Sequence, residues 1–113
     1  MAHSTTADDV FHALSNPTRR KVLERLSAGP ATVSELAAPF DMQLPSFVQH
    51  LSVLEQSRLV SSTKRGRVRT YAIAPARLKV VDDWLTARRQ EWEARLDRFD
   101  HYVTQLKTKE SGS

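Results

Sequence analysis

The sequence contains no cysteine, which excludes disulfide bonds, thiolate metal ligands and cysteine-based redox switches. It has no apolar run long enough to cross a bilayer, and its opening residues, Met1 to Ser4, lack the charged-then-apolar order of a signal peptide. No glycine-rich phosphate loop follows a candidate strand, and no serine has a histidine and an acid in a recognisable catalytic arrangement. We therefore expect a cytoplasmic protein that has no membrane segment and is not an enzyme.

Acidic residues are missing from one stretch of the chain. Between Lys64 and Lys79 every charged side chain is basic, although the net charge of the whole chain is only +4. These side chains are Lys64, Arg65, Arg67, Arg69, Arg77 and Lys79. A charge run is usually a solvated face, but a basic run around a glycine, with no acids to neutralise it, indicates a surface for a polyanion such as nucleic acid.

The length of 113 residues suits one compact domain. Two helices are predicted before residue 30. Thr6 can cap the first helix, with Asp9 three residues later. Asn16 and Pro17 supply an N-cap and a first-turn proline for the second helix, which ends at Gly29-Pro30. The apolar stripes of the two helices are Val10, Phe11, Leu14, Val22, Leu23 and Leu26.

Two more helices follow. Thr32 and Glu35 form a capping box for a short third helix, which runs until Pro39. The fourth helix is predicted to begin near Leu44-Pro45 and to end near Gln56. Its buried face is expected to hold Phe47, Leu51 and Leu54, and its outward face Ser46, Gln49, His50 and Val53.

The outward face of the fourth helix carries side chains suited to DNA. A serine hydroxyl pairs with several base edges, and a glutamine amide offers its donor and its acceptor together to adenine. Ser46 and Gln49 are therefore candidates for reading bases, and His50 is a candidate for donating to a phosphate. Ordinary exposed helices also carry serine and glutamine, so the assignment depends on the segment that follows.

That segment is predicted to be a hairpin with strands over 59–63 and 68–73, reversing at Gly66. Tyr71 and Ile73 share a face and are expected in the core. Simple alternation would send Arg67 and Arg69 inward too, unless the tip of the hairpin projects beyond the body into water.

A helix pair followed by an arginine-tipped hairpin is the layout of a winged helix-turn-helix. In that fold one helix enters the major groove and the hairpin, or wing, grips the adjacent DNA backbone. The expected fold class is mainly α with a two-stranded β-hairpin wing (α+β), dimerised through the first and last helices.

A long last helix is predicted from Pro75 or Ala76 to Leu106. Its apolar residues recur at spacings of three, four and seven: Leu78, Val81, Leu85, Trp92, Leu96, Phe99, Val103 and Leu106. About thirty residues of helix span roughly 45 Å, more than the width of a small winged domain. A second copy is the simplest cover for this stripe; the alternatives are a helix that folds back on its own domain or frays beyond Phe99.

The expected organisation follows from these elements. Residues 1–74 form the winged helix-turn-helix with an N-terminal dimerisation helix, 75–107 the long dimerisation helix, and 108–113 a flexible tail, all within one structural domain. The expected dimer interface comprises Val10, Phe11, Leu14, Leu85, Trp92, Leu96, Phe99 and Val103.

The segment from Asp9 to Ile73 resembles the ArsR-type winged-helix transcriptional regulators. The resemblance rests on the sequences at 13–20, 33–37, 45–55, 59–60 and 66–71. It implies a dimeric bacterial repressor that leaves its operator, in many members, when a metal or another signal binds. It places on the DNA-reading helix Pro45, Ser46, Val48, Gln49 and His50, and on the wing Lys64, Arg65, Arg67 and Arg69.

The chain departs from the metal-sensing members of this family. The segment 33–38 lacks the cysteine pair of arsenic, antimony, cadmium and lead sensors. Members that sense zinc or nickel resemble one another in an acidic-His pair and a second His pair on the last helix. In this chain the last helix holds only one histidine, His101, with Asp97 and Asp100 nearby. An ion pair explains Asp97 and His101 as well as a metal does. We therefore expect no metal and no cofactor, and the effector is unknown.

The sequence thus predicts a sequence-specific DNA-binding transcriptional regulator, a repressor acting as a homodimer on a pseudo-palindromic double-stranded operator. A different reading also stays open, in which the winged domain is a protein-interaction module without DNA binding. Such a module would be expected to carry a neutral or acidic hairpin, unlike the basic hairpin of this chain.

Overall fold

The computed structural model describes residues 6–111. Its elements, in chain order, are α1 (Thr6–Leu14), α2 (Pro17–Leu26), β1 (Ala31–Thr32), α3 (Val33–Ala37), α4 (Leu44–Gln56), β2 (Val60–Arg65), β3 (Val68–Ile73), a 3-10 turn (Pro75–Arg77) and α5 (Leu78–Ser111). The chain divides into two units, one through Val81 and the other from Asp82 onward. This boundary lies seven residues beyond the expected one between residues 74 and 75. The expectation that Met1 to Ser4 do not begin a signal peptide concerns residues outside the described range.

The helix starts of the first unit follow the predicted capping residues in two of three cases. The Asn16 side chain accepts the backbone N–H of Arg19 at 3.1 Å, with Pro17 directly after the cap. The capping box of Thr32 and Glu35 is also confirmed, with bonds of 3.2 and 3.0 Å. Thr6 differs, because it is the first residue within α1 and its hydroxyl accepts from Arg77 Nη1 at 3.0 Å.

The pair α3 and α4 forms the predicted helix-turn-helix. Phe47, Leu51 and Leu54 on α4 are wholly buried, as their spacing predicts. The ring of Phe47 lies 5.4 Å from that of Phe40, which fixes the segment between the two helices against α4. Val53 differs from expectation, because it is half-buried and packs against the core.

The sheet has three antiparallel strands in the order β1-β3-β2, so the prediction of a two-stranded wing was incomplete. The strand that was not predicted is β1, in which Ala31 pairs with Tyr71 and Thr32 with Thr70 of β3. Two residues are too few to show the alternation that identifies a strand in a sequence. The longer pairing, from Val60↔Ile73 to Arg65↔Val68, closes through Gly66, whose φ of 62° is readily adopted by glycine.

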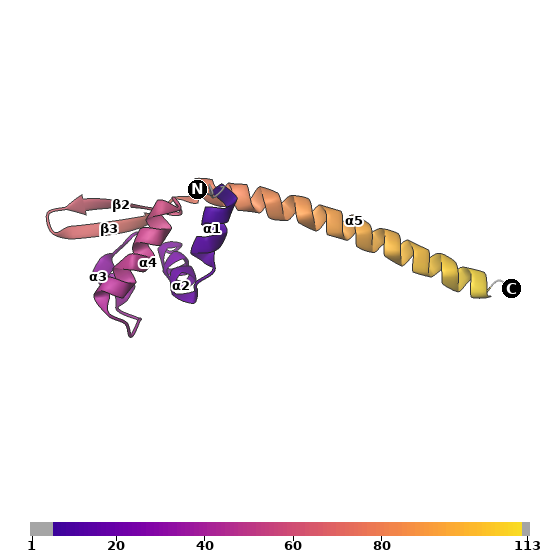
Figure 1. The fold of residues 1–113 in the computed structure, drawn as a ribbon, viewed down its shortest axis with the longest axis horizontal. Coiled ribbons are helices and arrows are strands. Elements are labelled where there is room, and N and C mark those ends of the chain that lie inside the picture. The colour runs from indigo at the N-terminus through magenta and orange to yellow at the C-terminus, as the bar shows by residue number, and fades with distance from the viewer. Residues whose placement is uncertain (1–5, 112–113) are drawn as a thin grey trace, which may run out of the picture. The chain divides into compact units, whose positions relative to one another are not determined.

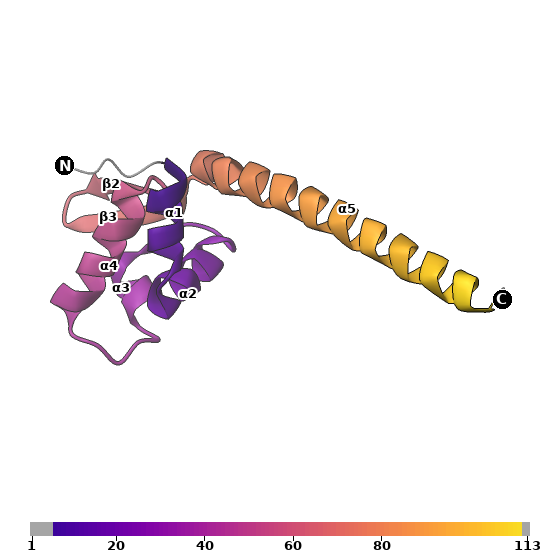
Figure 2. The same ribbon diagram turned by 45° about the vertical axis from the view of Figure 1, so that its right-hand side comes forward.

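The helices α1 to α4 gather beside the base of the β2–β3 hairpin (Figures 1 and 2), and the core of the first unit is formed by side chains of these elements. It comprises Val10, Ala13, Val22, Leu23, Leu26, Ala31, Leu36, Phe47, Leu51, Leu54, Leu59, Val60, Tyr71 and Val81. Val10 was expected in a dimer interface, but its side chain is fully buried among these residues. The stripe of α1 faces its own protomer at this position, so Val10 is a core residue.

The second unit consists of the remainder of α5. The helix continues to Ser111, so the predicted flexible tail from 108 is helical as far as the structure describes it. Its large apolar side chains are exposed, with 47% of Leu85, 54% of Trp92, 60% of Leu96 and 62% of Phe99 accessible. Among residues 6–111, no helix combines the length and apolar character needed to cross a bilayer.

Candidate nucleic-acid interface

The outward face of α4 presents a short row of accessible side chains. Pro45, Ser46, Val48 and Gln49 are all exposed, and His50 is partly exposed. Pro45 occupies the first turn of the helix, where a missing N–H costs nothing. The first two turns of α4 therefore carry every helix residue that the sequence assigned to DNA.

The wing carries its cations beyond the helices. Lys64, Arg65, Arg67 and Arg69 are all exposed, while Tyr71, on the same strand as Arg69, is buried. The tip of the β2–β3 hairpin lies beyond α3 and α4 (Figure 1). The prediction of a projecting hairpin is confirmed, because only a strand that leaves the body allows arginines on the face of a buried tyrosine.

Like charges face each other on this wing. Lys64 and Arg69 are Cα partners across the β2–β3 ladder, a pairing that is destabilising unless a counter-charge is present. Within residues 6–111, the side chains of Lys64, Arg65 and Arg67 have no hydrogen-bond or ion-pair partner. Arg25 on the body, by contrast, lies 3.8 Å from Glu35. The wing tip is a concentrated positive surface that a polyanion can neutralise.

Arg69 is restrained, unlike its neighbours at the tip. Its Nη1 donates to Ser62 Oγ at 2.7 Å, and Ser62 donates in turn to Glu55 Oε2 at 2.6 Å. Burial raises the pKa of the nearby Tyr71 hydroxyl, the Glu55 carboxylate raises it further, and Arg69 opposes both. This chain of contacts ties the base of the wing to the last turns of α4.

Arg19 is a residue whose place the sequence did not reveal. Two more basic residues, Arg20 and Lys21, follow it directly in α2, but only 7% of the surface of Arg19 is accessible. Its Nε donates to the carbonyl of Ala13 at 2.8 Å, and Nη2 donates to that of His12 at 3.0 Å. Nη1 lies 3.0 Å from His50 Nδ1 on α4. The signal in the sequence was the tight Asn16-Pro17 start, which places Arg19 beside the last turn of α1.

The possible metal ligands of α5, Asp97 and His101, do not belong to a group of metal-binding side chains among the described residues. His101 Nε2 lies 3.2 Å from the side-chain amide of Gln105, and the predicted partner Asp97 is exposed on the same helix. The part of the chain from 6 to 111 contains no group of three or more histidine, aspartate or glutamate side chains able to hold a metal.

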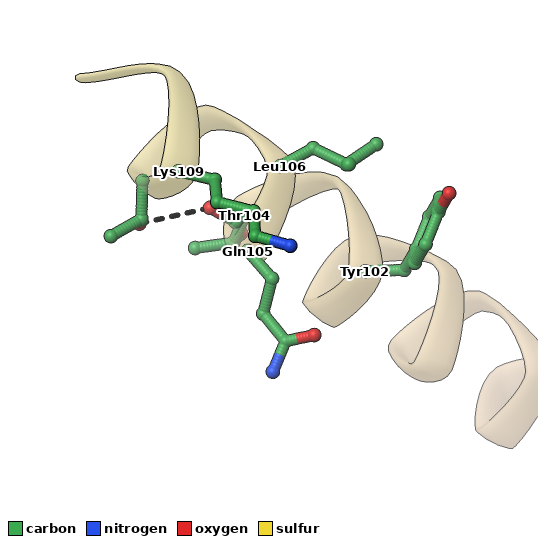
Figure 3. A pocket seen from close by; sticks show the side chains of 6 residues that line it. Tyr102, Thr104, Gln105, Leu106 and Lys109 are labelled. Carbon is green, nitrogen blue, oxygen red and sulfur yellow. Dashed lines mark hydrogen bonds between the residues drawn. The ribbon is translucent and has the colours of Figure 1, made fainter. Parts of the chain in front are cut away.

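A shallow hollow near the end of α5 also offers no enclosed site. It is lined by Tyr102, Thr104, Gln105, Leu106, Thr108 and Lys109, all on one helix. Figure 3 shows these side chains spreading away from the helix, with one bond of 3.0 Å from Thr108 to the Thr104 carbonyl. Side chains that diverge from a single helix cannot surround a small molecule.

In this chain α3 is followed by a turn, by α4 with its exposed face, and by a projecting basic wing. This arrangement is the DNA-binding surface of a winged helix-turn-helix protein. Comparison with known proteins gives the same class. Residues 14–63 match the family model of a helix-turn-helix domain.

Relatives extend the match over most of the chain. The chain is 33% identical over 78 residues to the transcriptional repressor SdpR of Bacillus subtilis, and the alignment covers 69% of this chain and 87% of SdpR. It is 38% identical over 81 residues to the HTH-type transcriptional regulator Rv2034 of Mycobacterium tuberculosis, covering 72% and 76%. The solved ArsR family transcriptional regulator RHA00566 is 52% identical and superposes with a TM-score of 0.76, over 79% of this chain and 98% of that one.

The chain belongs to the ArsR family of transcriptional regulators. It is accordingly a DNA-binding regulator and not an enzyme.

Proposed function

We propose that this chain acts as a homodimeric repressor that occupies a pseudo-palindromic operator and so blocks access of RNA polymerase to a promoter. The relative SdpR is named a transcriptional repressor, which supports this sign of regulation. The observation that carries the proposal is the unpaired basic wing tip beside the exposed start of α4, because a helix and a cationic hairpin together match a groove and its backbone.

Base reading belongs to the first turns of α4. Ser46, Gln49 and Val48 are exposed on α4, which supports pairing of the first two with base edges and a contact of Val48 with a thymine methyl group. Pro45 fixes the start of the helix and with it the depth at which these side chains enter the groove. His50, one turn after Ser46, donates to a backbone phosphate.

Backbone binding belongs to the wing. Lys64, Arg65 and Arg67 contact phosphates or the adjacent minor groove, and their binding releases counterions from DNA. Arg69, held by Ser62, sets the direction of the wing and adds positive charge close to the α4 surface.

Dimerisation pairs two such surfaces. The proposed interface retains the predicted residues other than Val10: Phe11, Leu14, Leu85, Trp92, Leu96, Phe99 and Val103. Phe11, Leu85, Trp92, Leu96 and Phe99 are exposed, Val103 is partly exposed, and Leu14 is partly buried against the core. The exposed stripe of α5 is unusual for a monomer and is covered when two copies associate. A two-fold dimer then places its recognition helices about one DNA turn, roughly 34 Å, apart.

A binding titration tests this function. Fluorescently labelled DNA from upstream of the chain's own coding region should be bound at two chains per duplex and should resist an excess of random competitor. Binding to random DNA should fall steeply when the salt concentration rises from about 50 to 200 mM. Equal affinity for upstream and random DNA, or one chain per duplex, would contradict the proposal.

A further inference from the structure

Arg19 makes an unusual set of bonds for an arginine of a DNA-binding protein. Only 7% of the residue is accessible and all three guanidinium nitrogens are engaged within the protein, so the group is not offered to DNA, although it carries a charge of the right sign. Two of its nitrogens satisfy the last carbonyls of α1, at Ala13 and His12. The third nitrogen reaches His50, which lies 31 residues further along the chain.

The contact with His50 determines where the imidazole proton lies. A guanidinium nitrogen can only donate, so Nδ1 of His50 must accept the bond at 3.0 Å. A neutral imidazole that accepts at Nδ1 carries its proton on Nε2. The ring of His50 is therefore held as an Nε2–H donor.

The free side of the ring is accessible. Among the described residues, His50 has no partner besides Arg19, and no buried side-chain nitrogen or oxygen lacks a hydrogen bond. Nε2 must therefore reach solvent. His50 follows Ser46 by four residues, which places it one turn further along the face of α4 assigned to DNA.

The surroundings also keep the ring neutral. Burial lowers the pKa of His50, and the charge of Arg19 lowers it further. A proton on Nδ1 would remove the acceptor of the Arg19 bond and place two positive charges together. The imidazole is thus a donor of fixed direction through the neutral pH range.

We propose that Arg19 is a positioning residue, which acts through His50 by fixing the tautomer and orientation of its imidazole so that Nε2–H donates to a DNA phosphate. The same guanidinium anchors the end of α1, so one buried side chain aligns α1, α2 and α4. The inference rests on the proposed DNA-binding function for its last step alone, because the tautomer is a property of the free protein.

Nitrogen-15 NMR of the imidazole groups tests the first step without DNA. At pH 7.5 the wild-type protein should show His50 with a bare Nδ1 and a protonated Nε2. Arg19→Gln should give a mixture of tautomers and an upward shift of the His50 pKa. Arg20→Gln is the matched control, because Arg20 bonds the Leu14 carbonyl at 2.7 Å and does not touch His50. A protonated Nδ1 in the wild type, or the same change in both variants, overturns the proposal.

DNA titration tests the second step. His50→Asn keeps an acceptor near the position of Nδ1 and removes the Nε2–H donor, so affinity should fall about tenfold on operator and random DNA alike. His101→Asn, on α5, is the control and should bind as the wild type does. Unchanged affinity of His50→Asn overturns the proposal. If the wild type binds no DNA, the repressor function fails, and the NMR result still decides whether Arg19 fixes the tautomer.

If Arg19→Gln does not fold, the wild-type spectrum decides the first step alone. The Nε2–H tautomer supports the positioning role and the Nδ1–H tautomer refutes it, whatever the stability of the variant.

Discussion

Ser62 on β2 donates its hydroxyl proton to the carboxylate of Glu55 on α4 across 2.6 Å. The same hydroxyl oxygen accepts from Arg69 at 2.7 Å, so its donor and an acceptor position are both used. The wing is therefore joined to the recognition helix by side chains as well as by the chain itself. We infer that these two side-chain bonds, together with the backbone bonds of the same junction, help to hold the wing against α4.

Replacing Ser62 with alanine should loosen that junction. Ser62→Ala removes both bonds and leaves Glu55 and Arg69 without their common partner, so the free energy of unfolding should fall by about 1–2 kcal/mol. Urea denaturation measures this loss. Ser61→Ala is the control, because Ser61 lies on the opposite face of the same strand and is exposed. Equal changes in the two variants would contradict a specific role for the Ser62 bonds.

The sequence predicted elements that local chemistry determines. The bounds of α4 agree with the prediction because Pro45 marks its start and the spacing of Phe47, Leu51 and Leu54 defines one buried face. The capping box at Thr32 is equally local. These features depend on residues only a few positions apart, so one sequence is enough to infer them.

The features that sequence reasoning missed depend on distant residues. β1 exists because Ala31 and Thr32 meet β3 about 40 positions later. Arg19 is buried because His50 and the end of α1 both face it. The Asn16-Pro17 start indicates only that Arg19 lies near the end of α1. Its contact with His50, and the burial of Val10 within its own protomer, depend on residues far away in the sequence.

Gln49 is predicted to carry sequence specificity. Its amide is exposed on α4, and loss of a base-specific pair of bonds typically costs about 1–3 kcal/mol. Gln49→Ala should therefore weaken binding to the operator by this amount while leaving the affinity for random DNA nearly unchanged. Competition titrations with both DNAs provide the comparison. A uniform loss on both would show that Gln49 contacts the backbone instead.

Arg67 is predicted to carry affinity without specificity. Arg67→Ala should weaken binding to all sequences alike and reduce the slope of log K against log salt by about one. Titrations at several salt concentrations measure the slope. Arg25→Ala removes the same charge from the body, where Arg25 faces Glu35, and should leave the slope unchanged. If both variants reduced the slope equally, net charge and not the wing would govern binding.

The lowered pKa of His50 predicts how stability depends on pH. Its ordinary value is 6.5, and burial followed by the charge of Arg19 lowers it in the folded protein. In the window between the two values the unfolded chain holds more protons, so stability rises with pH. The contribution is complete above pH 6.5 and is lost as the pH falls from there through the folded pKa.

Urea denaturation at pH 8, 7, 6 and 5 measures this effect against His50→Asn. The other three histidines are common to both proteins, so their titrations cancel in the difference. The wild type should lose more stability than the variant between pH 7 and pH 5. A constant difference across this range would show that His50 titrates alike in the folded and unfolded states.

The apolar stripe of α5 predicts a variant that separates association from folding. Leu96, 60% exposed in one chain, lies near the middle of the stripe, so Leu96→Glu would bury a charge in each copy of the proposed interface. The dissociation constant of the dimer should rise about a hundredfold, as measured by analytical ultracentrifugation. Ala94→Glu is the control, because Ala94 is exposed and lies on the opposite side of the helix.

The consequence for DNA follows from the geometry of two half-sites. A monomeric Leu96→Glu protein should still bind random DNA through its own wing but should lose most of its preference for a palindromic operator, since two linked contacts become one. The circular dichroism spectrum of the variant should still show a helical fold, because Leu96 lies outside the first unit. If Leu96→Glu stayed dimeric and Ala94→Glu became monomeric, the interface would lie on the other face of α5, and the stripe would need a different partner.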